Sequence, residues 1–408
     1  MDFVDFGTVA FYENPYPFYA DLRKEGAFVS LLPKIWMTGH YAVAEEVLKD
    51  RRLGRWHEEY VRLRYGDERK DEPVFQTFYQ MLLMLNPPQH TRVRALVMKA
   101  FNASHTEEFT SLARSIADAL IDRFIEQGST DLVSTYALRL PIMVICKLLG
   151  LEDADTGPFA EEMWKLTVPF SRAFEASGMS SFEIDEANRS ALRLQTLFRG
   201  EISKRRRQPR NDLISRFLEV EEEGQGMSED EIIANLIFLF VAGHETTANM
   251  IGNALVALYR HPDELVKIRR DPALIPAAVI ECLRFDGSVQ MAFRDVVEDV
   301  EIGGYRFRRG DTIFLCSGSA NRDPARFAEP DRFQVERSDV SARQLLNFGG
   351  GLHYCLGARL SMIELEVAIG ALLQRLPDLA IPDLDRLVWH QSNTLRGVET
   401  LRAQWRIQ

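Results

Sequence analysis

The stretch Phe348-Gly349-Gly350-Gly351-Leu352-His353-Tyr354-Cys355-Leu356-Gly357 decides how the rest of this 408-residue chain is interpreted. Three consecutive glycines let a backbone take tight or left-handed turns and approach a flat partner closely. The residues from Leu356 to Leu372 have the pattern of an amphipathic helix, so Cys355 is expected at a helix N-terminus. There the helix dipole and the free N–H groups favour a thiolate. A thiolate on a glycine-rich loop suits a soft metal ligand.

Other interpretations of this segment stay open on the residues alone. Cys355 could be an unreactive cysteine on a loop, or a nucleophile that takes its base from a histidine elsewhere in the fold. A phosphate-binding loop is disfavoured because Tyr354 occupies the last glycine position of Gly-x-Gly-x-x-Gly. The four cysteines form no Cys-x-x-Cys pair, which disfavours a zinc ribbon or a thioredoxin-like site.

Composition narrows the class of protein further. The chain has 49 Lys+Arg against 60 Asp+Glu and a formal net charge of −11, which disfavours a nucleic-acid partner. A hydrophobic content of 46% suits a globular protein that is large enough to bury a cofactor. No basic segment leads into an apolar one near the N-terminus, and the most apolar run, Leu236 to Gly243, is too short for a membrane span. We therefore expect a cytoplasmic protein without a membrane span.

The hydrophobic patterns predict a mainly helical chain with smaller sheet regions, organised as one domain over residues 1–408. Helical periodicity dominates between about residues 85 and 285. Strands are expected near 27–38, 290–320 and 375–408, with a hairpin around Gly303-Gly304. Arg205-Arg206-Arg207 is interpreted as a solvated helix end.

One helix is expected to be much longer than average. Ser228-Glu229-Asp230-Glu231 has the pattern of a capping box, and the helix that it opens can run to Arg260, before His261-Pro262. Its length would be about 48 Å at 1.5 Å per residue. The first half is apolar nearly all round, which predicts a place in the middle of the molecule.

The segment Ala242-Gly243-His244-Glu245-Thr246-Thr247 lies inside this helix. Gly243 and the threonines predict a local distortion of the helix. A buried acid next to an alcohol, as at Glu245 and Thr246, can pass protons. The zinc-protease motif His-Glu-x-x-His is excluded because Ala248 stands where the second histidine is needed.

Taken with these motifs, the segment from Phe348 to Gly357 resembles the haem-binding loop of the cytochromes P450, Phe-Gly-x-Gly-x-His/Arg-x-Cys-x-Gly, and fits every fixed place. Ala-Gly-x-Glu-Thr resembles the oxygen-activation motif of the same family. The resemblance implies an α+β fold shaped like a triangular prism, with haem b between the long central helix and the Cys-bearing helix. It implies Cys355 as the iron ligand, and Thr246 and Glu245 in oxygen activation and proton delivery. It places Ala242, Gly243, Phe348, Gly349 and Gly357 at the haem.

Two further motifs of the family follow the right order. Glu281-Cys282-Leu283-Arg284 matches Glu-x-x-Arg, and in Pro330-Asp331-Arg332-Phe333 the resemblance makes Arg332 the partner of that pair, with a structural role. By the same resemblance, the haem propionates are bound by His90, Arg94, Arg294 and His353. The chain departs from the family at Ser288, where a proline is common, so the following strand is expected to run differently over the haem.

The resemblance implies a haem-thiolate monooxygenase that inserts one oxygen atom from O2 into an apolar organic substrate, by hydroxylation or epoxidation. The substrate would be a secondary metabolite, a terpenoid or a fatty acyl chain. Electrons would come from a ferredoxin with an NAD(P)H-dependent reductase, or from a flavodoxin, docked on a basic face around Arg92, Lys99, Arg343 and Arg359. The substrate pocket is expected to be lined by Phe238, Leu239, Val289, Met291, Phe293, Asn393 and Thr394.

Two other classes of protein compete with this interpretation. A haem-binding sensor or carrier would have no need of Glu245 and Thr246. A hydrolase with a nucleophilic cysteine would be colourless.

Overall fold

The computed structural model describes residues 6–55, 57–101, 106–151, 162, 165–166, 178–220 and 225–407. The chain divides into two compact units, which are described separately. Unit 1 comprises Met1–Gly54, Thr106–Pro141 and Glu245–Gln408, and unit 2 comprises Arg55–His105 and Ile142–His244. Helices hold 59% of the residues, which confirms a mainly helical fold with small sheets. The single domain remains a prediction, because it concerns how the two units are placed.

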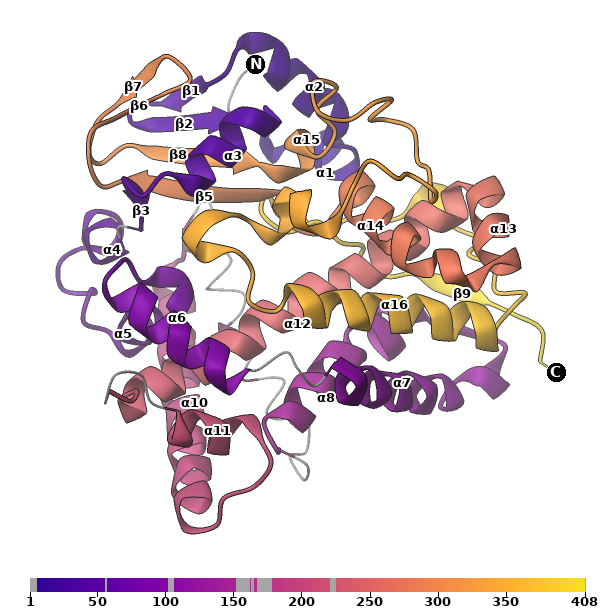
Figure 1. Ribbon diagram of the computed structural model, residues 1–408, viewed down its shortest axis with the longest axis horizontal. Helices are drawn as coiled ribbons and strands as arrows, with labels where there is room; N and C mark the ends of the chain where they lie inside the picture. The colour runs from indigo at the N-terminus through magenta and orange to yellow at the C-terminus, as the bar shows by residue number, and fades with distance from the viewer. Residues whose placement is uncertain are drawn as a thin grey trace. The chain divides into compact units, whose positions relative to one another are not determined.

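The largest sheet belongs to unit 1 and has the strand order β1-β2-β8-β5-β3. The pair β2–β8 is parallel, whereas β1–β2, β5–β8 and β3–β5 are antiparallel. Helices α2, α3 and α15 lie beside this sheet (Figure 1). The bounds are β1 Val29–Leu32, β2 Ile35–Thr38, β3 Leu53–Gly54, β5 Met291–Val296, β8 Thr312–Cys316, α1 Val9–Glu13, α2 Tyr16–Glu25, α3 Tyr41–Lys49 and α15 Ser317–Ala320.

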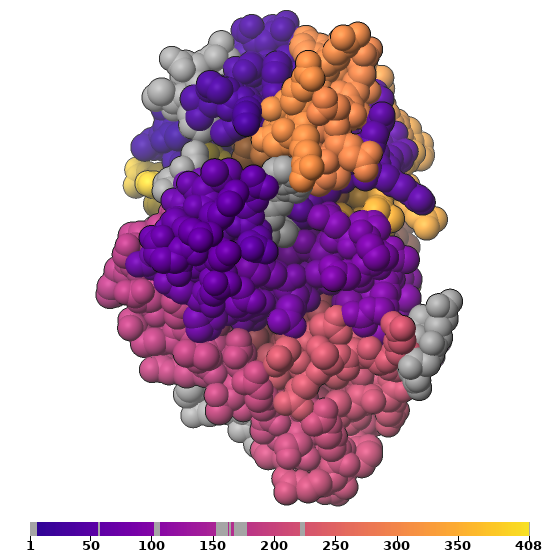
Figure 2. Space-filling model, turned by 90° about the vertical axis from the view of Figure 1, so that its left-hand side faces the viewer, coloured from indigo at the N-terminus to yellow at the C-terminus, as the bar shows by residue number. Residues whose placement is uncertain are grey.

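Two smaller sheets complete the β structure described in unit 1. Strands β6 (Val300–Ile302) and β7 (Tyr305–Phe307) form the expected hairpin, in which Gly303 and Gly304 both have positive φ. In Figure 2 this orange region touches the indigo N-terminal segment. Strand β4 (Ser129–Asp131) pairs with β9 (Arg402–Gln404). The expectation of a strand-rich C-terminus is largely wrong, because the described residues after 375 hold only β9 and isolated bridges.

Among the remaining helices of unit 1, α7 and α14 pack against α16. Helix α16 packs along α7, and the Arg375 guanidinium donates to Asp122 at 2.6 Å (Figure 1). Tyr136 donates its hydroxyl proton to the Ala368 carbonyl at 3.0 Å. The bounds are α7 Thr106–Asp122, η4 Ile125–Gln127, η5 Val133–Ala137, α13 Pro262–Arg270, η6 Pro272–Leu274, α14 Ile275–Asp286, η7 Ala342–Gln344, η8 Leu346–Phe348, η9 Gly351–His353, α16 Ala358–Arg375 and η10 Leu384–Arg386.

Helix α10 of unit 2 ends at the run of three arginines, as predicted, but this run is not solvated throughout. Arg205 in its last turn is only 2% exposed, so the interpretation of this run as solvated is wrong at that residue. Its guanidinium donates to Asp212 at 2.8 Å and to the Gly150 carbonyl at 2.7 Å, and it also pairs with Glu201. The bounds are α4 His57–Tyr65, α5 Pro73–Tyr79, η2 Leu82–Met84, α6 Gln89–Ala100, α10 Ser181–Arg207 and α11 Leu213–Glu219, with α8 Arg139–Leu148 beginning in unit 1.

The long helix is α12, Glu229–Arg260, with 32 residues. The predicted capping box is present: Glu231 N–H donates to Ser228 Oγ at 3.1 Å, and Ser228 N–H donates to the Glu231 carboxylate at 2.9 Å. Residues 242–247 are helical throughout, so the distortion expected there is not observed. In the part of the chain that the structure describes, no helix combines the length and the low polarity needed to cross a bilayer.

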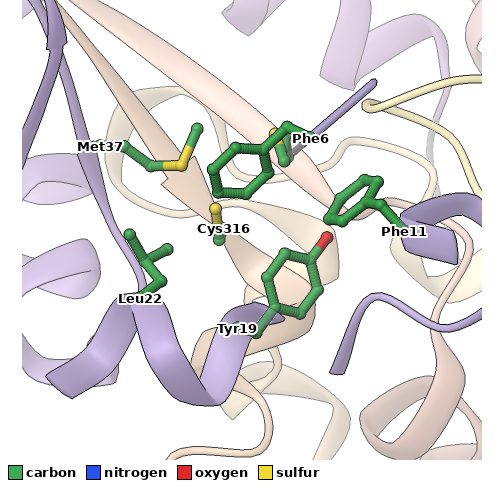
Figure 3. Packing of buried hydrophobic residues seen from close by; sticks show 7 residues of the cluster. Phe6, Phe11, Tyr19, Leu22, Met37 and Cys316 are labelled. Atoms are coloured by element: carbon green, nitrogen blue, oxygen red, sulfur yellow. The ribbon is translucent and has the colours of Figure 1, made fainter. Parts of the chain in front are cut away.

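The N-terminal helices of unit 1 are fixed by an apolar cluster and by an ion pair. Figure 3 shows side chains from α1, α2, β2 and β8 packed together, and Phe11 is 2% exposed. Beside this cluster the Asp286 carboxylate accepts from Tyr16 Oη at 2.5 Å and from Arg396 Nε at 2.8 Å. Arg396 also donates to the carbonyls of Tyr12 and Glu13. The start of the chain is thus attached to α14 and to the C-terminal region.

A buried ion pair on α14 organises the irregular segment that follows the sheet. Arg284 and Glu281 have side chains that are 0% and 1% exposed, and Arg284 Nε lies 2.7 Å from the Glu281 carboxylate. The other guanidinium protons are donated to carbonyls of Asn321 at 3.1 Å, Pro330 at 2.7 Å and Arg332 at 3.3 Å. Because these acceptors are backbone groups, the pair fixes the path of residues 321–332.

The third member of this cluster is Arg337, and the prediction of Arg332 is wrong. The Arg332 side chain is 64% exposed and pairs with Glu329, so that residue contributes only its carbonyl. The Arg337 side chain is 6% exposed and places Nε 3.2 Å from the Glu281 carboxylate. It also donates to the Ala328 carbonyl at 2.8 Å.

Comparing Arg337→Ala with Arg332→Ala tests this assignment. The first variant removes a buried guanidinium from a buried carboxylate, so we expect the free energy of unfolding to fall by about 3 kcal/mol. The second removes an exposed side chain and should cost less than about 1 kcal/mol. Urea-induced unfolding followed by circular dichroism measures both. A larger loss in Arg332→Ala than in Arg337→Ala would assign the contact to Arg332 instead.

Helix α16 buries a carboxyl group that the predictions did not include. Glu364 is 4% exposed, and its Oε2 has no hydrogen-bond partner among the described residues. Burial raises the pKa of this carboxyl to about 8. Above pH 4.5 the unfolded chain releases this proton while the folded chain keeps it, so stability falls as the pH rises towards 8.

Glu364→Gln should remove this dependence on pH. The amide cannot ionise, so the variant should exceed the parent in free energy of unfolding by on the order of 3 kcal/mol at pH 7 and by only about 1 kcal/mol at pH 5. Urea unfolding across pH 5 to 8 gives the difference at each pH. The matched control is Glu298→Gln, at an exposed position. A difference between Glu364→Gln and parent that stays constant with pH would contradict the raised pKa.

Candidate functional site

The loop that carries Cys355 is closed by its own backbone. Cys355 N–H donates to the Phe348 carbonyl at 2.9 Å, and Tyr354 N–H donates to the Gly351 carbonyl at 3.2 Å. Gly349 and Gly351 have backbone φ angles of 67° and 61°, which residues with a side chain rarely adopt. A Cβ at Gly351 would also overlap the carbonyl oxygen of Leu48, the eighth residue of α3. Glycine is therefore required at position 351.

The thiol stands directly before the helix that follows. Helix α16 begins at Ala358, two residues later than the amphipathic pattern indicated. Ser361 N–H donates to the Gly357 carbonyl at 2.9 Å, which starts the first turn. Cys355 therefore lies three residues before the first helical residue, so the expected dipole effect on its thiol is weaker than at a capping position.

Cys355 differs from the other cysteines in its exposure. Cys146, Cys282 and Cys316 are buried, whereas Cys355 is partly exposed. Burial raises the pKa of the Cys146 thiol to about 11 and raises the pKa values of Cys282 and Cys316 further. Those three thiols are therefore protonated and inaccessible. Cys355 is the cysteine that can act as a ligand or a nucleophile.

Two asparagines tie the loop to the buried ion pair of α14, and sequence reasoning missed both. Asn321, whose carbonyl binds Arg284, accepts the Leu346 N–H at its Oδ1 at 3.1 Å and donates from Nδ2 to Asn347 at 2.5 Å. Asn347 donates in turn to the Val289 carbonyl at 3.2 Å. No motif spacing marks these residues, because each acts on backbone groups that are distant in sequence.

Helix α12 contacts the Cys-bearing helix next to the predicted oxygen-activation pair. Thr247 Oγ1 lies 3.4 Å from Ser361 Oγ on α16. Glu245 and Thr246 directly precede Thr247 on α12. The structure thus places the acid–alcohol pair on the helix that packs against α16.

Strand β5 holds one predicted cofactor residue and contradicts one pocket residue. Arg294 is 3% exposed and donates to the Phe293 carbonyl at 2.9 Å. Side chains alternate along a strand, so Met291 and Phe293 face away from Arg294. Met291 belongs to the apolar cluster around Phe11 shown in Figure 3, so its assignment to the substrate pocket is wrong. Ala292, which the pocket prediction omitted, shares the face of Arg294.

The structure brings three other pocket candidates together. Val289 forms an isolated bridge with Leu395, and Gln290 N–H donates to the Thr394 carbonyl at 2.9 Å. Asn393 directly precedes Thr394, and its Oδ1 is buried without a partner among the described residues. Apolar and hydrogen-bonding groups therefore meet at this turn.

The other candidates lie on two helices of unit 2 and near the loop of unit 1. His90 is 1% exposed and lies one turn before Arg94 on α6. The four candidates of unit 2 on α12 are Phe238, Leu239, Ala242 and Gly243, and His353 ends η9 in unit 1. The predicted set is thus divided between the two units.

The donor set of unit 1 fits a haem better than a bare metal ion. Within the described residues, no group of three His, Cys, Asp or Glu side chains could hold a metal ion. Among the described residues, a metal at Cys355 would therefore have fewer than three such protein ligands, which suits an iron that brings its own porphyrin nitrogens. The nearby loop backbone at Gly349 and Gly351 takes conformations that suit close approach to a flat group.

Comparisons with known proteins agree with this site. The family model "Cytochrome P450" matches residues 166–385. A putative cytochrome P450 133B2 of Xylella fastidiosa is 43% identical over 99% of both chains, and the vitamin D(3) 25-hydroxylase of Pseudonocardia autotrophica is 35% identical over 97% of this chain and 95% of its own. The structure of P450BioI in complex with a hexadec-9Z-enoic acid ligated acyl carrier protein has a TM-score of 0.89, at 32% identity and 98% and 99% coverage.

The chain therefore agrees with these relatives in sequence over nearly its whole length, and its fold agrees with that of P450BioI. The members of that family are monooxygenases that bind haem b through a cysteine thiolate. The chain belongs to the cytochrome P450 family.

Proposed function

We propose that Cys355 would hold haem b through its thiolate and that the chain inserts one oxygen atom from O2 into an apolar organic substrate. The observation that carries this proposal is the accessibility of Cys355. It is the partly exposed cysteine, on a loop that its own backbone closes and that Asn321 and Asn347 attach to α14.

The chain's own residues have separate tasks in this reaction. The haem supplies the activation of O2, and a thiolate ligand favours cleavage of the O–O bond. Thr246 and Glu245 hold and deliver protons at the hydroxyl and the carboxylate. Arg294 and His353 of unit 1 would hold haem propionates by charge-assisted hydrogen bonds, each worth about 1.5–3 kcal/mol, and the same role is proposed separately for His90 and Arg94 of unit 2.

We propose that the substrate is a fatty acyl chain, a terpenoid or a polyketide-derived molecule with few oxygens. Two relatives support this: a 6-deoxyerythronolide B hydroxylase at 32% identity, and P450BioI, solved in complex with a hexadec-9Z-enoic acid ligated acyl carrier protein, also at 32% identity. Val289, Asn393 and Thr394 combine apolar surface with hydrogen-bonding groups at one turn. Such a mixture suits a long apolar molecule that carries an oxygen at one point.

Electrons would come from a ferredoxin with its NAD(P)H-dependent reductase, or from a flavodoxin. Arg92 is a poor candidate for docking such a partner, because it already pairs with Glu231. Arg343 and Arg359 are exposed, and they precede and follow the Cys355 loop in the sequence. We therefore assign the docking of the acidic partner to these two arginines.

The visible spectrum of the purified protein tests the ligand. Reduced protein under carbon monoxide should show a strongly red-shifted Soret band, which reports thiolate ligation of the iron. Cys355→Ser should abolish this band and the oxidation of substrate, and Cys146→Ser, at a buried cysteine, serves as the control. A colourless parent, or a Cys355→Ser variant with the unchanged band, would refute the proposal.

The same spectra test the substrate class. Binding of a substrate next to the haem would shift the spin state of the iron, which the visible spectrum reports. Titration with fatty acids, terpenoids and macrolide precursors, free and linked to acyl carrier protein, should give a shift for one class at micromolar concentration. Shifts of equal size and affinity for all classes would contradict a selective acyl, terpenoid or polyketide site.

A further inference from the structure

The unit 1 half of α12 carries a polar face that the proposed reaction does not account for. Thr246, Asn249 and Asn253 are spaced i, i+3 and i+7, so they lie along one face of the helix. Asn249 is 6% exposed and Asn253 is 0% exposed. Buried amides need hydrogen-bond partners, because a buried polar group without one is costly.

Both asparagines face the same segment near the C-terminus. Asn253 Nδ2 donates to the Arg396 carbonyl at 3.0 Å and to the Asp286 carbonyl at 3.2 Å. Gly397 follows directly, and a Cβ on it would overlap Asn249 Oδ1. The two amides therefore lie side by side between α12 and residues 396–397.

Their remaining hydrogen-bonding groups are complementary. Asn249 Nδ2 is a buried donor and Asn253 Oδ1 is a buried acceptor, and neither has a partner among the described residues. Side chains four residues apart on a helix have Cβ atoms about 5–6 Å apart, a spacing that one water molecule can bridge. A water accepts from one group and donates to the other, and buried waters make about three such bonds.

We infer that Asn249 and Asn253 form a binding site for one buried water molecule, and that this site positions the turn of α12 that carries Thr246. The water completes a continuous polar connection from that turn to Asn253, which holds the carbonyls of Asp286 and Arg396. The carboxylate of Asp286 binds Arg396 at 2.8 Å and Tyr16 at 2.5 Å. The turn is thereby attached to the buried ion pair of Asp286 and Arg396.

Stability distinguishes a bridged amide from an unsatisfied one. Replacing an unsatisfied buried amide by an apolar side chain of similar size is neutral or stabilising, whereas replacing a bonded one leaves its partner unsatisfied. We therefore expect Asn249→Leu to lower the Tm of the haem-loaded protein by about 1–3 °C. Met250→Leu, a volume-conserving change at the adjacent buried residue, is the control and should leave the Tm nearly unchanged.

The water itself gives a second measurement that needs no turnover. Magnetic relaxation dispersion of water counts long-lived buried molecules, and Asn249→Leu should have one fewer than the parent. Asn249→Ser keeps a donor and leaves space, so it should keep this molecule. An unchanged or higher Tm in Asn249→Leu, with an unchanged number of buried waters, would overturn the site.

The positioning role rests on the proposed monooxygenase function and has its own readout. In Asn249→Leu the share of electrons that ends in hydrogen peroxide instead of product should rise at least twofold, and Asn249→Ser should restore the parent value. If the water were lost and this share did not change, the water site would stand, but its role in positioning the turn that carries Thr246 would be refuted. If Cys355 did not bind haem, the Tm and the number of buried waters would still show whether Asn249 and Asn253 bind a water molecule.

Discussion

Arg284 on α14 sets the constraint on which the candidate site depends. Its guanidinium is removed from water, and a buried ion pair is tolerated only when the remaining donors also find acceptors. Glu281 satisfies two of these donors, and carbonyls of residues 321, 330 and 332 satisfy the others. Because the acceptors are backbone groups of a segment without regular secondary structure, any other path for that segment would leave buried charge unsatisfied.

The position of Cys355 follows from this segment. The Asn321 side chain forms hydrogen bonds with residues 346 and 347, which fixes the start of the loop. The loop is then closed by the hydrogen bond from Cys355 N–H to the Phe348 carbonyl. The other side of the loop rests against Leu48, where Gly351 leaves no room for a side chain. Backbone contacts from three distant parts of the sequence therefore hold the thiol. A loop held in this way needs little from its own side chains, which leaves the cysteine partly exposed.

The predictions that succeeded depend on local rules. The capping box of α12 joins residues three apart, and the hairpin at Gly303-Gly304 depends on two turn residues, so the sequence alone specifies them. Arg337 was missed because the irregular segment around it gives no period that orients side chains. Arg205 was predicted to be solvated because it is charged. Its partners, Asp212 and the Gly150 carbonyl, come from other parts of the chain, so the local sequence does not reveal that it is buried. The error at Met291 was avoidable, because the alternation of side chains along a strand already places Met291 and Arg294 on opposite faces.

The asparagines of α12 explain why apolar periodicity describes this helix incompletely. Asn235 in unit 2 accepts from Leu82 N–H at 2.9 Å and donates to the Gln80 carbonyl at 3.1 Å. Asn253 in unit 1 likewise binds backbone of other segments. It donates to the carbonyl of Asp286, the last residue of α14, and to the carbonyl of Arg396 near the C-terminus. Non-helical backbone that lies against a buried helix needs donors and acceptors that aliphatic side chains lack. An amide supplies both in the volume of a leucine, so a buried asparagine on a long helix marks where an irregular segment crosses it.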